Sequence, residues 1–374
     1  MNDKKYKLFI KDFLNLFFVW WQYFEKNSVK AVIGSHAVYC LAIPLRIAAN
    51  KKIKSFVLSP EYLFKIGKIN YYQGYEYPHL KKIFNSLDKK KQKNIKQIAK
   101  KNIKDRIIGK YSTDYPYVTK SPFDNNNKNF YKKYFDNKKK KFLITTHDFV
   151  DAPHALGNSL FEDFYIWLKF LLDNSNDRRV QWYIKTHPNF GSNWSVYIKY
   201  ERKVVKNLCK KYKNVILLPQ NITHNDIVKN KIEAVFTVNG TVGLDYALLK
   251  IPVINASLNN PHINYQFNVH PKSVKQLLEI IKNFDLKKKI SMEEIYSFYA
   301  MKNIFFSKNW FFLNFDKTVK SIESYHNLWD PLFYSYWIKK EYPVLNNFEL
   351  EQRLKKFIVS DENFCLVNNN LGKF

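Results

Sequence analysis

Five short runs of β-branched and aromatic residues recur between residues 141 and 255, at residues 141–147, 180–186, 215–218, 234–238 and 253–255. Each run ends at a cluster of polar or helix-breaking residues and is followed by a segment with apolar residues at helical spacing. These segments cover residues 160–172, 194–211, 224–231, 242–249 and 274–284. A parallel sheet with crossover helices requires this alternation of strand and helix. The pattern therefore predicts an α/β domain.

The first part of the chain begins with a similar pattern. We expect a buried strand at residues 29–36, a helix at 37–49 and a second strand at 54–59. This βαβ start predicts that the N-terminal domain is also Rossmann-like. Further helices are expected near residues 293–306 and 316–328, and there is no internal repeat of fixed period.

The length and composition of the chain suggest two domains, since 374 residues with 46% hydrophobic content can form two cores. Composition becomes Lys- and Asn-rich between residues 81 and 141, which we interpret as a solvated helix followed by an inter-domain linker. The predicted divisions are residues 1–135 with this linker, residues 141–315, and C-terminal helices with a tail at 316–374.

Residues 6–24 form a strongly apolar run that Lys11 and Asp12 interrupt. No small-residue cleavage site follows, and the run is too short and too charged to be read as a membrane span. Two interpretations stay open. The segment is an amphipathic helix packed on its own domain, or it lies on a membrane surface with Phe and Trp on one side and Lys at the rim.

The formal net charge of +30 raises the question of a polyanionic partner. Only six of the 62 basic residues are Arg, whereas base-edge recognition and bidentate phosphate recognition favour Arg. Lys is abundant together with Asn, Ile, Tyr and Phe, as a compositionally biased genome would produce. Solvated lysine faces and attraction to an anionic membrane both fit this pattern, and specific nucleic-acid binding is disfavoured.

The cysteines do not suggest a structural framework. Cys40, Cys209 and Cys365 are scattered, with no paired spacing. Neither a set of disulfides nor a structural zinc site is therefore predicted, and a reducing cytoplasm is the expected compartment.

The first candidate for chemistry is the His-Pro pair after the strand at residues 180–186. Pro188 stops the strand from continuing, so the imidazole of His187 is expected at the carboxyl end of that strand. In open α/β sheets this edge is where ligands bind. A histidine there can hydrogen-bond a phosphate or ribose oxygen, and the alternative is a satisfied structural histidine.

The second candidate is the turn at Asn239, Gly240 and Thr241, between a strand and a helix start. Backbone N–H groups and the Thr hydroxyl can hold an anion in such a turn, and Gly240 and Gly243 allow close backbone approach. Asp245 lies one helical turn after Thr241, so the two can share a face. Helix capping is the alternative, and the segment matches neither the dinucleotide fingerprint nor the P-loop.

The third candidate is the connection at residues 146–164, which is rich in histidine and acidic residues: His147, Asp148, Asp151, His154, Glu162 and Asp163. A carboxylate here could be the general base that deprotonates an acceptor hydroxyl. The alternative is that the aspartates at 148 and 151 are turn and capping residues, and that the later pair forms a solvated first helical turn. No two of the histidines have HxxxH spacing, so no metal site is predicted.

Two segments together carry a family resemblance. KTHPN at residues 185–189, followed roughly fifty residues later by VFTVNGTVGLDYALLKIPVIN at 235–255, resembles the capsule polysaccharide biosynthesis proteins. It also resembles the wider group of GT-B transferases that use CMP- or CDP-activated donors, including Kdo- and sialyl-type enzymes and CDP-glycerol glycerophosphotransferases. HDFVDAPHALGNSLFEDFYIWL at 147–168 resembles the entry to the second domain of such proteins. The resemblance covers mainly residues 141–285.

The resemblance implies an α/β, GT-B-like fold, in which two Rossmann-like domains face each other across a cleft. It also assigns a role to each candidate. His187 with Pro188 would contact the donor phosphate or ribose, and Asn239, Gly240 and Thr241 would hold the phosphate. Asp245 would organise that helix start, and Asp151, or else Asp148, would be the acceptor base. Lys185, His154 and His262 are additional candidates. The chain has Gly240-Thr241 where several relatives have Ser-Ser or Ser-Thr, so one hydroxyl is missing.

The resemblance implies a glycosyltransferase of capsule or surface-polysaccharide biosynthesis that needs no metal and no cofactor. Its substrates would be a nucleotide-activated sugar (CMP- or another NDP-sugar) and a lipid-linked or growing polysaccharide. The expected location is the inner face of the cytoplasmic membrane, on an anionic surface, with no specific nucleic acid as partner. A CDP-polyol phosphotransferase is the alternative enzyme, and a basic nucleic-acid-binding protein is the alternative from another class.

Overall fold

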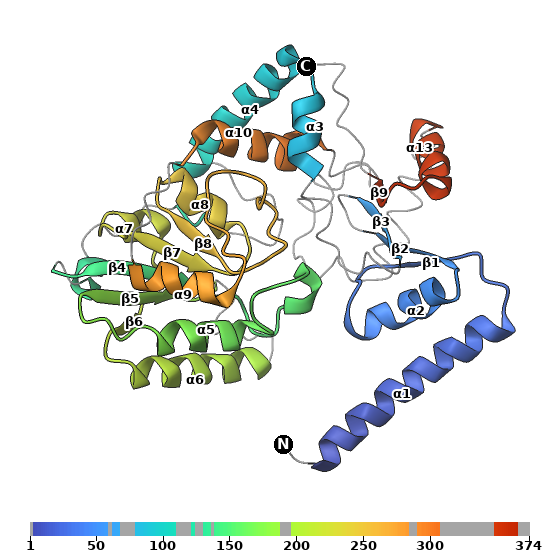
Figure 1. Ribbon diagram of the computed structural model, residues 1–374, viewed down its shortest axis with the longest axis horizontal. Helices are drawn as coiled ribbons and strands as arrows, with labels where there is room; N and C mark the ends of the chain where they lie inside the picture. The colour runs from blue at the N-terminus through green and yellow to red at the C-terminus, as the bar shows by residue number, and fades with distance from the viewer. Residues whose placement is uncertain are drawn as a thin grey trace, which may run out of the picture. The chain divides into compact units, whose positions relative to one another are not determined.

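The computed structural model shows two compact units, one made of residues 1–76 with 304–374 and the other of residues 77–303 (Figure 1). The structure describes residues 3–58, 62–67, 79–109, 121–123, 130–135, 138–187, 196–283, 290–306 and 348–365.

The second unit is built on a five-stranded sheet whose paired strands are all parallel. Its strands are β4 (Lys140–Thr145), β5 (Val180–Lys185), β6 (Val215–Leu217), β7 (Ala234–Thr237) and β8 (Val253–Asn255). They lie in the order β6-β5-β4-β7-β8. The chain moves outward from β4 to one edge and then returns to add β7 on the other side. The sheet therefore has a topological switch point between β4 and β7.

Alternating side chains along these strands form a core on each face of the sheet. Phe142 and Ile144 of β4 pack against one group of helices, while Leu143 points to the opposite face. The first face is covered by α5 (Phe164–Asp173), α6 (Val196–Lys211) and α9 (Val274–Asn283), and the second by α7 (His224–Val228) and α8 (Val242–Leu248) (Figure 1). Because both faces are covered, the strands are nearly continuous hydrophobic runs.

Three further helices of the second unit pack together: α3 (Leu80–Ser86), α4 (Lys89–Ile107) and α10 (Met292–Ala300). Asp88 caps α4 by accepting a hydrogen bond from the Lys91 amide at 2.8 Å. The buried stripe of this Lys-rich helix is Ile95, Ala99 and Ile103, and it ends at Arg106. The guanidinium of Arg106 donates Nε to Asp245 Oδ1 at 3.0 Å and Nη2 to Asp245 Oδ2 at 3.2 Å. This buried pair joins α4 to α8.

The first unit contains a four-stranded sheet in the order β1-β2-β3-β9. β1 (Ala31–Gly34) and β2 (Lys54–Leu58) are parallel and joined by α2 (Tyr39–Asn50), whereas β3 (Leu63–Lys65) and β9 (Phe364–Cys365) add in antiparallel fashion. A Cβ on Gly34 would lie 2.9 Å from Leu45, so α2 packs closely on the strand end. The helices α1 (Asp3–Lys26) and α13 (Phe348–Val359) complete the described part of this unit.

The α/β fold class predicted from the sequence is confirmed, and each of the five strands expected between residues 141 and 255 forms. The βαβ start of the first unit also forms, but its sheet continues with antiparallel strands. The compact units divide the chain at other positions than those predicted, because α3 and α4 pack with α10 in the second unit. The helix expected at residues 316–328 lies outside the described residues. None of the described helices meets the length and hydropathy that a bilayer span requires.

We expect Arg106→Met to destabilise the second unit by about 3–5 kcal/mol, because the Asp245 carboxylate stays buried without its cation. The measurement is urea-induced unfolding. Lys100→Met is the matched control, because Lys100 is on the same helix and pairs with Glu293 in an exposed position; it should cost about 0–1 kcal/mol. Equal losses of unfolding free energy in the two variants would show that the buried pair contributes no more to stability than the exposed one.

Candidate functional site

One hydrogen bond joins the two loops that flank the switch point of the sheet. The backbone N–H of Asn239, after β7, donates to Nε2 of His147, after β4, at 3.1 Å. The sequence placed both residues at strand ends, and the strand order brings these ends next to each other. In an open parallel sheet, the carboxyl edge at the switch point is the usual position of a ligand.

The surroundings of His147 determine the charge and the tautomer of its ring. Its ring stacks on Phe164 with centroids 4.5 Å apart. Burial, and next the neighbouring His187, lower the pKa of His147 to about 4. Because Nε2 accepts from an amide, the proton of the neutral ring is on Nδ1. His147 therefore positions the Asn239 turn and carries no charge near neutral pH.

The turn after β7 presents backbone and hydroxyl groups at the surface. Asn239 is buried, and its Oδ1 accepts from the Gly240 amide at 2.6 Å. Gly240 has φ +98°, a left-handed conformation that favours glycine, and a Cβ there would lie 3.4 Å from the His147 ring. Thr241 is exposed and its side chain makes no capping hydrogen bond to α8. The Thr241 hydroxyl is thus not used to cap the helix, which was the alternative interpretation of this segment.

Asp245 lies in a different environment from the turn. Its side chain is buried against Arg106, and His224 Nε2 lies 3.7 Å from Oδ2. Burial pushes the pKa of Asp245 upward, but Arg106 and His224 outweigh it and hold the pKa below its usual value. The carboxylate anchors α8 from inside the unit. Gly243, on the same helix, is needed for packing, because a Cβ there would lie 2.8 Å from Nε2 of His262.

A second group of residues lies at the carboxyl ends of β4 and β5. Asp148 is buried, and its Oδ2 is 3.2 Å from Nδ1 of His187, whose side chain is 34% exposed. Asp151 is exposed on the loop, and its amide donates to the Asp148 carbonyl at 3.1 Å. Partial burial raises the pKa of Asp151; the nearby His187 opposes this shift and Asp148 adds to it. The structure therefore brings Asp148, Asp151 and His187 together.

Glu201 of α6 completes this group. It is 3% exposed, and its Oε2 accepts from the Phe149 amide at 2.8 Å, which ties the loop after β4 to α6. Burial raises the pKa of Glu201 to about 7, and Asp148 adds to the effect. Within the described residues, three buried oxygens of this group have no hydrogen-bond partner: Thr146 Oγ1, Asp148 Oδ1 and Glu201 Oε1. Buried oxygens without partners are unusual and mark a place suited to a polar ligand.

The other sequence candidates lie elsewhere in the second unit. Lys185 Nζ donates to the Ile222 carbonyl at 2.8 Å, and burial lowers its pKa to about 8. His154 is exposed on a 3-10 turn (Pro153–Leu156). His262 is buried behind Gly243, where Asn268 Nδ2 bonds its Nδ1 at 3.3 Å. Pro188 lies outside the described residues.

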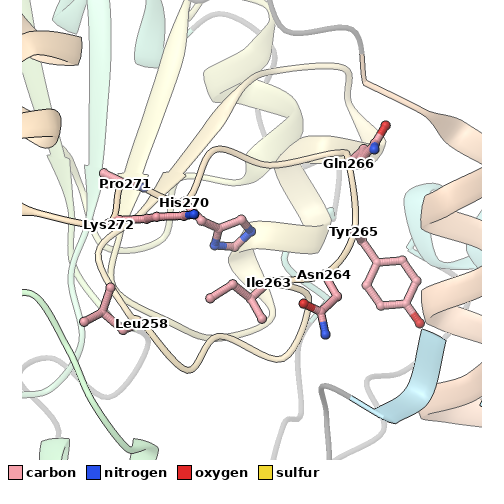
Figure 2. Close-up of a pocket in the computed structure, with 8 residues that line it drawn as sticks. All are labelled: Leu258, Ile263, Asn264, Tyr265, Gln266, His270, Pro271 and Lys272. Carbon is pink, nitrogen blue, oxygen red and sulfur yellow. The ribbon is translucent and has the colours of Figure 1, made fainter. Parts of the chain in front are cut away.

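A pocket of about 290 Å³ lies in the loop between β8 and α9 (Figure 2). Its walls are Leu258, Ile263, Asn264, Tyr265, Gln266, His270, Pro271 and Lys272. None of these residues belongs to the group at the switch point. No sequence pattern predicted this pocket, and the polar groups suited to catalysis lie at the β4 and β7 loops.

Sequence reasoning assigned no role to Glu201 or Arg106, although each carried a signal. Glu201 shares the apolar stripe of its helix with Val205 and Leu208, and Arg106 continues the stripe that contains Ile103. A charged residue on a buried face must find a partner. Within the described residues, no group of three or more His, Cys, Asp or Glu side chains could hold a metal ion.

Neither a family model nor a curated protein sequence matches the chain. Solved structures do resemble it. KpsC of Thermosulfurimonas dismutans, a β-Kdo 2,4-transferase, has a TM-score of 0.44 and 13% identity over 72% of this chain and 79% of its own. A second KpsC structure of Thermosulfurimonas dismutans, a β-Kdo 2,7-transferase, has a TM-score of 0.38 and 12% identity over 74% of this chain and 77% of its own. UDP-GlcNAc 2-epimerase of Methanocaldococcus jannaschii, in complex with UDP-GlcNAc and UDP, has a TM-score of 0.34 and 12% identity over 75% and 77%.

We expect Glu201 to make the stability of the second unit fall as pH rises. Its pKa moves from 4.5 in the unfolded chain to about 7 in the folded one, so the folded state holds an extra proton between these values. Stability from this proton is present at low pH and lost as pH rises through about 7, an effect on the order of 1–3 kcal/mol.

Thermal unfolding of the wild type and Glu201→Gln across roughly pH 5 to 8 tests this linkage. The melting temperature of the wild type should fall relative to that of Glu201→Gln as pH rises. Glu279→Gln, at an exposed position of α9, is the control. The difference in melting temperature between the wild type and Glu279→Gln should stay constant as pH rises. A constant difference between wild type and Glu201→Gln would contradict the expectation.

Proposed function

We propose that this protein is a glycosyltransferase that takes a nucleotide-activated sugar as donor and a surface polysaccharide or its lipid-linked precursor as acceptor. The observation that carries the proposal is the joined pair of loops at the switch point, where the Asn239 amide bonds His147. This arrangement holds an exposed turn with small residues beside a second loop that carries two aspartates and a histidine. It fits a ligand with phosphates on one side and a reacting hydroxyl on the other.

In this proposal the donor phosphates lie against the turn at Gly240 and Thr241. The absence of a side chain at Gly240 allows close approach of a phosphate oxygen, and the Thr241 hydroxyl supplies a donor. A protonated His187, held at Nδ1 by Asp148, donates to the departing phosphate. These groups stabilise the leaving group in the role that a cation has in other transferases.

The acceptor hydroxyl is activated by Asp151. Its carboxylate is exposed at the rim of the edge, where an acceptor arrives, whereas Asp148 is buried and engaged with His187. A raised pKa makes Asp151 a stronger base than an ordinary carboxylate. We assign Asp148 the role of orienting His187. In this proposal the enzyme works at the inner face of the cytoplasmic membrane, beside its acceptor.

We expect His187→Ala to abolish stabilisation by nucleotide while the fold is retained. A bound nucleotide should stabilise the wild type by about 2.7 kcal/mol at roughly 100-fold excess over its Kd. The measurement is a thermal-shift panel with CMP, CDP, UDP and GDP. His154→Ala is the control, because it removes an exposed imidazole of the loop after β4, and it should respond as the wild type does. Full nucleotide stabilisation of His187→Ala would refute the donor role of His187.

We expect Asp151→Asn to lower turnover by roughly 10²- to 10⁴-fold, because the variant lacks the base but keeps the shape of the side chain. Nucleotide stabilisation should be unchanged, since the base acts on the acceptor. Transfer from the donor identified in the thermal-shift panel provides the measurement. Wild-type turnover in Asp151→Asn together with an inactive Asp148→Asn would move the base to Asp148, and activity in both would remove this loop from the mechanism.

A further inference from the structure

The first helix carries an apolar stripe that is covered only along its second half. In that half, Phe17, Trp20, Trp21 and Phe24 pack against Ile43, Ile47 and Ala48 of α2. The same stripe continues toward the N-terminus with residues at helical spacing: Tyr6, Phe9, Ile10, Phe13 and Leu14. We call these five residues the N-terminal half-stripe. Figure 1 shows that the N-terminal end of α1 lies away from α2.

The N-terminal half-stripe is exposed throughout, with side chains between 38% and 68% accessible. Three of its members are aromatic and two are aliphatic. Scattered exposed apolar residues are normal on a protein surface, but a continuous row on one face marks an interaction site.

The remaining faces of this half of α1 are mostly basic, with Leu8 as an exposed apolar residue among the lysines. Lys4, Lys5, Lys7 and Lys11 lie off the stripe, and the acidic residues of the same half are Asp3 and Asp12. An apolar stripe with aromatic residues and lysines on the other side is the pattern of a helix that lies in the plane of a membrane interface. Lysines at that level are attracted to anionic lipid headgroups, and the net charge of +30 adds to the attraction.

We propose that the N-terminal half-stripe docks on an anionic lipid bilayer surface. A second copy of this chain fits the surface less well, because pairing would bring two strongly basic molecules and two rows of lysines together. The proposal makes the membrane partner of the proposed function specific. The proposal depends only on the residues of α1, so it can be refuted while the proposed nucleotide site is unaffected.

Co-sedimentation of the full chain with vesicles tests the proposal, with phosphatidylcholine alone compared with phosphatidylcholine mixed with phosphatidylglycerol. The wild type should bind the mixed vesicles and bind the neutral ones much more weakly. Phe9→Glu combined with Phe13→Glu should reduce binding roughly tenfold or more, because it places two carboxylates in the apolar layer. Phe18→Glu is the matched control, because Phe18 is 55% exposed on α1 but lies off the stripe, and it should bind as the wild type does.

Unchanged vesicle binding in the double variant would overturn the proposal, as would a wild type that ignores both vesicle types. A third outcome is that the wild type is dimeric, the double variant is monomeric and neither binds vesicles. This result would assign the N-terminal half-stripe to a contact with a second copy of the chain. Nucleotide thermal shifts measured on the same samples separate this result from the proposed function. They should be equal in the wild type and the double variant whether or not the membrane proposal holds.

Discussion

The buried pair of Arg106 and Asp245 is the interaction on which the arrangement of the second unit depends. It joins two helices whose paired residues are 139 positions apart, and it supplies the permanent positive charge beside a buried carboxylate whose other neighbour is His224. A buried ion pair adds little net stability over an apolar pair of the same shape, but here two hydrogen bonds hold the guanidinium to the carboxylate in a bidentate arrangement. The position of α8 is therefore fixed from inside the unit, and with it the turn at Gly240 that begins at the end of β7.

The fixed position of α8 has a consequence at the sheet edge. The Asn239 amide can reach Nε2 of His147 only if the turn after β7 lies beside the loop after β4. That loop is held a second time, by the Phe149 amide on Glu201. Two loops from different parts of the chain thus have their backbones tied to rigid elements. The exposed side chains of Asp151 and Thr241 therefore lie at defined places. Among the described residues they make no side-chain hydrogen bond, so they are available to a ligand that binds and leaves.

The sequence predicted what is local and missed what is not. Hydrophobic periodicity gave the strands of the second sheet and the strand ends that carry His187 and Asn239, because alternation and helical spacing are properties of neighbouring residues. It could not show that α4, the most Lys-rich helix, belongs with α10, because that packing joins residues far apart in the chain. Likewise, the resemblance implied that Asp245 organises the helix start after the turn, but only the fold could show that Arg106 faces its carboxylate.

Protonation also limits how much negative charge this edge of the sheet carries. His147 is neutral because burial depresses its pKa to about 4, so it adds no positive charge. Glu201, with a pKa of about 7, keeps its proton on the acid side of neutrality and loses it above. Ionisation of Glu201 would add a buried negative charge beside Asp148 and His187, and in the proposed function it would weaken the attraction of this edge for the donor phosphate. The helix that ties down the loop therefore also contributes a group that sets the charge of the site near neutral pH.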